Sequence, residues 1–490
     1  MTFGVLLAVA LLGADRPCKI QVVDDRTGRG VPLVELRTVD ETRYYTDSAG
    51  VVAFDEPGLM GIYTYFHVKS HGYEVAADGF GNRGVALTPL AGGSTLIKIK
   101  RVNIAERLYR VTGGGIYRDS VMVGDPVPIR QPLLNGLVLG SDSVLNAVYG
   151  GKLWWFWGDT NKPSYPLGNF HTPGATSRLP ADGGLDPDLG VDLEYLVDPT
   201  GFARPTAELP GPGPTWLFGL VVLKVDGRER MFAGYSKIKG MLEVYERGLV
   251  EFDPGTKRFH KVATFPKGVK AYPDGHSSIR FENGVEYVYF STPFPVTRVP
   301  ATPEALADPS QYEVYSAVLP DGMPDRSTGV VAHYAWRKGV GRTSARELAG
   351  LVLGQGGGFV EDPLALKDIV SGATVWPHSG STEWNEYRRK WVVIAVQEGG
   401  RSFLGEVWYA EADTPLGPWS PARRVVTHQQ YSFYNPRQHP EFAKRGGRDL
   451  FFEGTYTATF SGNLGPTPRY DYNQVMYKLD LDDPSLRAAP

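Results

Sequence analysis

Acidic side chains stand at both ends of an unusual apolar segment, "GSDSVLNAVYGGKLWWFWGDTN", residues 140–161. Asp142 precedes the first apolar stretch, and Asp159 follows the second, which holds three tryptophans. The Gly-Gly pair between the stretches is typical of a tight hairpin turn, which would bring both acids to the same end of the hairpin. Carboxylates bind hydroxyl groups and transfer protons, so the segment indicates a site on one rim of a larger assembly. Asp159 also opens the turn-forming "DTN", where a carboxylate can cap backbone N–H groups instead.

A strand, a short turn and an aromatic-rich strand recur at residues 217–236, 274–293, 381–398 and 437–456. Their turns are DG, NG, YRR and GG, mostly the glycine turns that tight hairpins require. Further hairpins lie between them, and a sheet of four strands can bury both faces only against similar neighbours. Five such units in series predict a five-bladed β-propeller, whose last sheet the final "YDYNQVMYKLDL" would complete or clip to the first. Six blades, with an extra sheet from residues 113–140, are the alternative.

Composition agrees with an all-β chain. Glycine (59) and proline (38) are frequent, as many turns require, and long stretches of helical periodicity are scarce. Apolar residues at 42% suffice for a core, and the net charge of −3 without a basic block argues against nucleic acid binding. The glycine runs at 113–115 and 356–358 lack the lysine and helix of a phosphate loop.

The start of each inner strand and the end of its partner reach the same rim of a propeller. Carboxylates bind sugar hydroxyls and transfer protons, and aromatic faces pack on the C–H faces of sugar rings. The rim is therefore expected to bind a glycan. Besides Asp142, Asp274 and Glu383, the residues expected there are Trp154, Asp159, His276, His378, Trp384, Glu398, Tyr434, His439 and Glu453.

Three phrases carry a resemblance to a known family. "ADTPLGPWSPARRVV" (412–426) is similar to the "S-P-L-G-P-W" phrase of five-bladed propeller glycoside hydrolases of the arabinanase, xylosidase and invertase type. "YPDGHSSIRFENGVEYVYFS" (272–291) is similar to their blade entry, and "WFWGDT" resembles related, poorly characterised glycosidase-like propellers. The resemblance spans roughly residues 113–482 and implies cleavage of glycosidic bonds in a poly- or oligosaccharide.

The family uses a base or nucleophile, an assisting Asp and a Glu acid. By position, the resemblance implies Asp142, Asp274 and Glu383 for these roles. The second hairpin has no acid at its entry, and Gly275 stands where the family has proline. The chemistry needs two carboxyl groups about 5 Å apart for retention or ~6.5–9.5 Å apart for inversion. It also needs a proton donor of raised pKa.

No cofactor or metal is required for this chemistry. A structural calcium ion on the propeller axis is an accessory that the sequence leaves open. Two other functions also stay open. One is a non-catalytic propeller that binds carbohydrate or protein, and the other is a polysaccharide lyase that uses His and Tyr. The oligomeric state is not readable from the sequence.

The beginning of the chain predicts export and an accessory domain. Residues 1–16, "MTFGVLLAVALLGADR", have the short apolar stretch of a signal peptide, which predicts a secreted or periplasmic protein, and no segment is long enough to span a membrane. Cys18 is the only cysteine, which excludes an intramolecular disulfide. Residues 17–103 alternate as strands of a small β-sandwich, and "YYTDSAGVVAF" resembles carboxypeptidase regulatory-like (transthyretin-like) modules. Residues 104–139 are expected to lead into the propeller, residues 140–482.

Overall fold

The structure is a computed structural model that describes residues 16–487, except 241, 328–332, 354–361 and 464. The predicted signal peptide, apart from Arg16, lies outside the described residues. The chain forms two compact units, one reaching Arg101 and including Tyr117–Val127, the other made of Val102–Ile116 and the chain from Pro128 onward. Among the described residues, no helix has the length and hydropathy needed to cross a bilayer.

The first unit is a sandwich of two four-stranded sheets, with strand orders β4-β1-β8-β6 and β3-β2-β5-β7. The strands are β1 (Cys18–Asp24), β2 (Glu35–Thr38), β3 (Arg43–Tyr45), β4 (Val51–Phe54), β5 (Thr64–Lys69), β6 (Tyr73–Glu74), β7 (Gly84–Leu87) and β8 (Ser94–Arg101). Helix α1 (Arg118–Val123) belongs to the same unit, where the Ala53 amide donates to Asp119 Oδ1 at 3.1 Å. Both sheets contribute side chains to one hydrophobic core, which includes Ile20, Phe54 and Phe66. The predicted sandwich is therefore confirmed.

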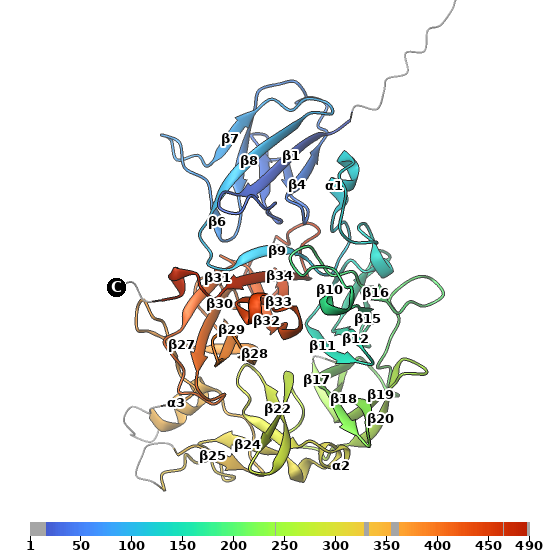
Figure 1. The fold of residues 1–490 in the computed structure, drawn as a ribbon, viewed down its shortest axis with the longest axis vertical. Helices are drawn as coiled ribbons and strands as arrows, with labels where there is room; N and C mark the ends of the chain where they lie inside the picture. Colours follow the sequence, from blue (N-terminus) through green and yellow to red (C-terminus); the bar gives the residue numbers. More distant parts are fainter. Residues whose placement is uncertain (1–15, 241, 328–332, 354–361, 464, 488–490) are drawn as a thin grey trace, which may run out of the picture. The chain divides into compact units, whose positions relative to one another are not determined.

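The second unit contains five antiparallel sheets of four or five strands, the blades of the propeller. Figure 1 shows them arranged around a centre in chain order. The first blade consists of β11 (Val144–Tyr149), β12 (Lys152–Trp157), β15 (Gly174–Ser177) and β16 (Glu194–Tyr195), and the second of β17 (Thr215–Val225), β18 (Arg228–Lys239), β19 (Glu243–Asp253) and β20 (Arg258–Thr264). The third blade has five strands, β21 (His276–Glu282), β22 (Val285–Ser291), β23 (Thr297–Pro300), β24 (Glu313–Ser316) and β25 (Ala335–Arg337). The fourth consists of β28 (Pro377–Asn385), β29 (Lys390–Gln397), β30 (Glu406–Ala412) and β31 (Arg423–Thr427).

The fifth blade closes the ring with a strand from the beginning of the unit. It consists of β32 (Ser432–Gln438), β33 (Asp449–Thr457), β34 (Asn473–Asp480) and β9 (Glu106–Arg110). The final strand thus completes the last sheet, and β9 pairs with its outer edge, Arg110 opposite Val475. Residues 113–140 form no blade of their own, because they contribute only α1, the turn η1 (Asn135–Leu137) and the first residue of β10 (Gly140–Ser141). The prediction of five blades is confirmed.

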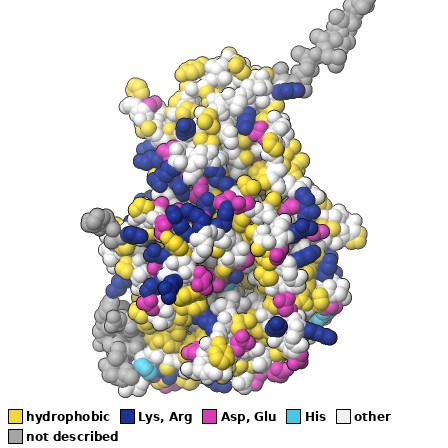
Figure 2. Space-filling model, viewed as in Figure 1, with side chains coloured by type: hydrophobic (Ala, Val, Ile, Leu, Met, Phe, Trp, Pro, Cys, Tyr) yellow, Lys and Arg dark blue, Asp and Glu magenta, His cyan; other side chains and the backbone are white. Residues whose placement is uncertain are grey.

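Short elements decorate the ring. Strand β13 (Thr160–Lys162) pairs with β10, and β14 (Tyr165–Asn169) pairs with β13. The others are the pair β26 (Leu366–Lys367) and β27 (Thr374–Val375) and the helices α2 (Pro303–Ala307) and α3 (Ala345–Leu353). Figure 2 shows cationic and anionic side chains intermingled over the visible face, in keeping with the small net charge.

The tryptophans of β12 fill both faces of the first blade, since successive side chains of a strand point to opposite sides. Trp155 and Trp157 stack at 6.2 Å between ring centroids and pack against the fifth blade through Phe451 and Met476. On the other face, Trp154 and Phe156 pack into the second blade. These aromatic side chains therefore hold three consecutive blades together, which explains their crowding in the sequence.

Candidate active site

A pocket of about 260 Å³ lies where the inner strands of all five blades meet; we call it the axial pocket. Both ends of the β11–β12 hairpin, the beginnings of β17, β21 and β28, and an irregular turn of β32 at Asn435 form its walls. Three carboxyl groups line it, those of Asp142, Asp159 and Asp274. The volume lies slightly below the ~300–1,000 Å³ of most small-molecule sites, so the pocket suits a group the size of a sugar ring.

The two acids of the first hairpin sit side by side in this pocket. The backbone amide of Asp142 donates to the Asp159 carbonyl at 2.9 Å, which fixes the strand ends together. The Ser143 hydroxyl donates to Asp142 Oδ1 at 2.7 Å, and Trp216 Nε1 donates to Asp159 Oδ1 at 3.0 Å. The indole of Trp216 therefore orients one carboxyl group while its ring forms part of the wall.

Burial raises the pKa of the Asp159 carboxyl group. The pKa of Asp159 is raised to about 6, mainly because burial desolvates its carboxylate. The hydrogen bond from Trp216 lowers this pKa, and the adjacent negative charge of Asp142 raises it further. Burial and the Asp142 carboxylate also raise the pKa of Tyr434 and Tyr472 well above the usual value of 10. Both phenols thus keep their protons beside Asp142. The pocket consequently holds one carboxyl group of raised pKa, that of Asp159, beside a second carboxyl group, that of Asp142.

Replacing Asp159 by Asn is expected to stabilise the propeller in a pH-dependent manner. The folded-state pKa of about 6 exceeds the ordinary aspartate value of 3.8, so the folded chain loses stability as pH rises through this interval. The gain from Asp159→Asn should increase from under ~1 kcal/mol at pH 4 to about 3 kcal/mol at pH 8. Chemical unfolding followed by tryptophan fluorescence measures it, with the exposed Asp226→Asn as control. A gain that does not depend on pH would contradict the raised pKa.

Asp274 and His276 enter the pocket from the third blade. Asp274 forms an ion pair with Arg342, which also donates to the Thr292 hydroxyl, and it accepts the Gly275 amide at 2.8 Å. Burial, together with the positive charges of Arg437 and His439, lowers the pKa of His276 well below its usual range. The neutral imidazole has no hydrogen-bond partner among the described residues. It is therefore available to a ligand.

Glu383 does not line the axial pocket. Its strand begins at Pro377, earlier than the expected hairpin, so Ser379 and Gly380 occupy the entry instead. Glu383 lies three residues beyond Gly380 on this strand, which places it about 10 Å deeper along the propeller axis. There Glu383 forms an ion pair with Arg437, whose Nε donates to Asn146 Oδ1 at 3.0 Å. Burial raises the pKa of Glu383 while Arg437 opposes the rise.

His439 and Glu453 also lie away from the expected rim. The inner strand of the fifth blade is β32, which ends at Gln438, because Pro440 cannot donate to a sheet and opens the turn η4 (Pro440–Phe442). His439 therefore follows the far end of the strand, buried at 1% exposure. It contacts Glu453 at 2.9 Å and Glu441 at 3.0 Å. Burial opposes protonation, but these two carboxylates raise the pKa of His439 overall.

The other residues expected to bind the glycan lie in the core, in a second pocket or at the surface. Trp154 lies in the core against Phe252, with ring centroids 4.8 Å apart. Trp384 points away from the axis, 40% exposed, because its neighbour Glu383 points inward. His378 lines a neighbouring pocket of about 270 Å³ with Tyr315 and Tyr334, and this pocket shares Thr292 with the axial pocket. Glu398 forms an ion pair with Arg346 at 3.1 Å.

Sequence reasoning missed Trp216 and Asn435. Trp216 precedes the expected second hairpin by one residue, and a tryptophan directly before an apolar strand was the available signal. Asn435 has a positive φ of 51°, and its side-chain amide donates to the Ser143 hydroxyl. No sequence pattern indicated its position, because an irregularity interrupts β32 at this point. No group of three or more His, Cys, Asp or Glu side chains among the described residues is arranged to hold a metal ion.

No protein-family profile matches the sequence, and no curated protein matches it. Several solved structures are similar in fold. One is a protein from Bacteroides ovatus provisionally described as a hydrolase, with 14% identity over 73% of this chain and 89% of that chain and a TM-score of 0.40. Another is an N-acetylgalactosamine deacetylase from F. plautii, with 12% identity over 76% and 95% and a TM-score of 0.37. A third is an exo-1,5-α-L-arabinanase from a bovine ruminal metagenomic library, with 10% identity over 70% and 94% and a TM-score of 0.36. Similarity this distant does not transfer an activity.

Proposed function

We propose that the protein is a glycoside hydrolase-like enzyme that cleaves glycosidic bonds of a poly- or oligosaccharide in the axial pocket. The observation that supports this most is the pair Asp142 and Asp159, which share one pocket and of which Asp159 has a pKa near 6. Glycoside hydrolysis requires a proton donor of raised pKa together with a second carboxyl group. Trp216 and Phe218 supply aromatic surface for a sugar ring.

The roles follow from these environments. The protonated Asp159 carboxyl group donates its proton to the glycosidic oxygen as the C–O bond breaks. The Asp142 carboxylate acts as base or nucleophile, and water completes the hydrolysis. Asp274, held by Arg342, assists by its negative charge, and the neutral His276 binds a hydroxyl group. In this proposal Asp159 takes the part that position in the sequence had given to Glu383.

A non-catalytic carbohydrate-binding propeller is the second candidate. It is favoured by one observation, that Asp274, the third carboxyl group of the axial pocket, is engaged in an ion pair with Arg342. A carboxylate held in this way binds and positions more readily than it transfers protons. The two candidates predict different outcomes with the same ligand.

The deciding experiment incubates the purified chain with arabino-, xylo-, galacto- and fructo-oligosaccharides. Chromatography and a reducing-sugar assay detect hydrolysis, ultraviolet absorbance detects the unsaturated products of a lyase, and calorimetry detects binding. Sugar release without ultraviolet absorbance supports the proposal. Binding without any product would establish the second candidate, and unsaturated products would identify a lyase.

A further inference from the structure

A pocket of about 430 Å³ lies at the outer part of the first blade; we call it the loop pocket. It is formed by the start of β12, the end of β15, the loop 178–193, β16 and Arg130. Phe442 of the fifth blade provides an aromatic wall. The loop pocket and the axial pocket share no lining residue, so the two are separate sites.

The loop is held in place from the fifth blade. Lys444 Nζ contacts Asp186 at 2.8 Å and Asp188 at 2.6 Å, and Lys478 Nζ contacts Asp188 at 2.6 Å. The Tyr109 hydroxyl donates to the Pro187 carbonyl at 2.8 Å. These contacts tie the loop across the joint between the last and the first blade. The pocket is therefore preformed, which lowers the entropic cost of binding.

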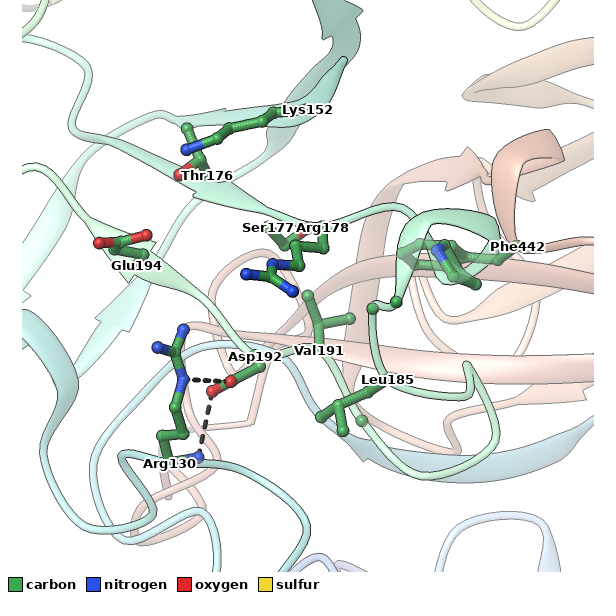
Figure 3. Close-up of a pocket in the computed structure, with 14 residues that line it drawn as sticks. Arg130, Lys152, Thr176, Ser177, Arg178, Leu185, Val191, Asp192, Glu194 and Phe442 are labelled. Atoms are coloured by element: carbon green, nitrogen blue, oxygen red, sulfur yellow. Dashed lines mark hydrogen bonds and ion pairs between the residues drawn. The ribbon is translucent and has the colours of Figure 1, made fainter.

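Two cations in the pocket have no anionic partner. The Arg130 side chain is committed to Asp192, which also accepts the Arg130 amide at 3.1 Å. Lys152 and Arg178 form no ion pair with any described residue. Figure 3 shows the Arg178 guanidinium in the middle of the pocket, with the Arg130–Asp192 pair on one side and Lys152 on the other. The ionic side chains of the lining are three cations and two anions, Asp192 and Glu194, so a single net positive charge faces a ligand.

The remaining lining suits a polyhydroxylated molecule. The hydroxyls of Thr176 and Ser177 and the carboxylate of Glu194 line the pocket beside the cations. Ser177 Oγ accepts the Trp155 indole N–H at 2.9 Å, which fixes its position. A sugar needs donors and acceptors close together, and an arginine beside a lysine adds a place for a carboxylate or sulfate.

We propose that the loop pocket binds an anionic saccharide, through a carboxylate or sulfate group held by Lys152 and Arg178. The site is independent of cleavage in the axial pocket. It would retain an acidic glycan at the outer edge of the propeller whether or not the axial pocket is catalytic.

Isothermal titration calorimetry of the purified chain with trigalacturonate, galactose 6-sulfate and neutral galactotriose tests the proposal. The trigalacturonate and sulfate arms distinguish a carboxylate from a sulfate ligand. At least one anionic probe should bind at least ~10-fold more tightly than galactotriose, and more weakly as salt increases. The double variant Lys152→Gln/Arg178→Gln should lose at least ~10-fold in affinity for that probe, because it removes both charge-assisted hydrogen bonds to the anionic group.

The matched control is Lys224→Gln/Lys267→Gln, which removes the same charge from exposed positions elsewhere on the ring. Equal unfolding temperatures of the two double variants would show that both fold. Affinity for the anionic probes that falls equally in both would reduce the effect to net charge and overturn the proposal. So would galactotriose binding as tightly as the anionic probes. Because the readout is binding, failure of the proposed hydrolysis leaves this result unaffected.

Discussion

Asp142→Asn should reduce glycan hydrolysis by about 10²–10⁴-fold without disturbing the propeller. Asparagine retains the Oδ1 atom that accepts the Ser143 hydroxyl, so the strand end keeps its position. What disappears is the charge that activates water or attacks the anomeric carbon. Initial rates of sugar release on the best substrate of the panel measure the loss. Asp226→Asn, in an exposed hairpin turn, is the control and should retain full activity.

Asp159→Asn gives a second, more specific signature. A proton donor matters most when the leaving group is a poor one, so the loss should be large for an oligosaccharide and small for an aryl glycoside. Glu383→Gln should remain within a few-fold of the parent on both substrates, because Glu383 lies outside the axial pocket. If Glu383→Gln instead shows the dependence on leaving group, the proton donor is Glu383 and the assignment of Asp159 is wrong.

The inner hairpins of the first four blades could be predicted from sequence because they are local. Turns such as Gly150-Gly151 and Asn283-Gly284 adopt the positive φ values that their glycine or asparagine residues permit, and each joins the two strands expected around it. Asp142 and Asp159 flank one such turn. Their meeting at one pocket needed only the hairpin geometry.

The depth of each inner strand could not be predicted in the same way. Glu383 and His439 were placed by counting from an expected strand start, and an error of a few residues moves a side chain by about 10 Å along the axis. The closing strand β9 and the arginine partners of Asp274 and Glu383 come from segments distant in sequence. Such pairings depend on the closed ring, which no local pattern encodes.

Breaking the Glu383–Arg437 ion pair should destabilise the propeller strongly. Their side chains are only 17% and 10% exposed, so either charge left alone would be poorly solvated. Glu383→Met and Arg437→Met should each lower the free energy of unfolding by about 2–4 kcal/mol. The double variant should cost less than the sum of the two, because it removes both charges together.

Denaturant unfolding followed by tryptophan fluorescence measures this cycle selectively, since all ten tryptophans belong to the propeller unit. The exposed pair Lys239–Glu243, 3.4 Å apart, supplies the control, and Glu243→Met should cost no more than ~0.5 kcal/mol. Strictly additive losses in the double variant would mean that Glu383 and Arg437 act independently. In that case the neighbouring Arg280, whose positive charge also acts on the Glu383 carboxylate, would be the partner that holds Glu383 in its charged form. The double variant Glu383→Met/Arg280→Met, in place of Glu383→Met/Arg437→Met, should then lose less unfolding free energy than the sum of its single variants.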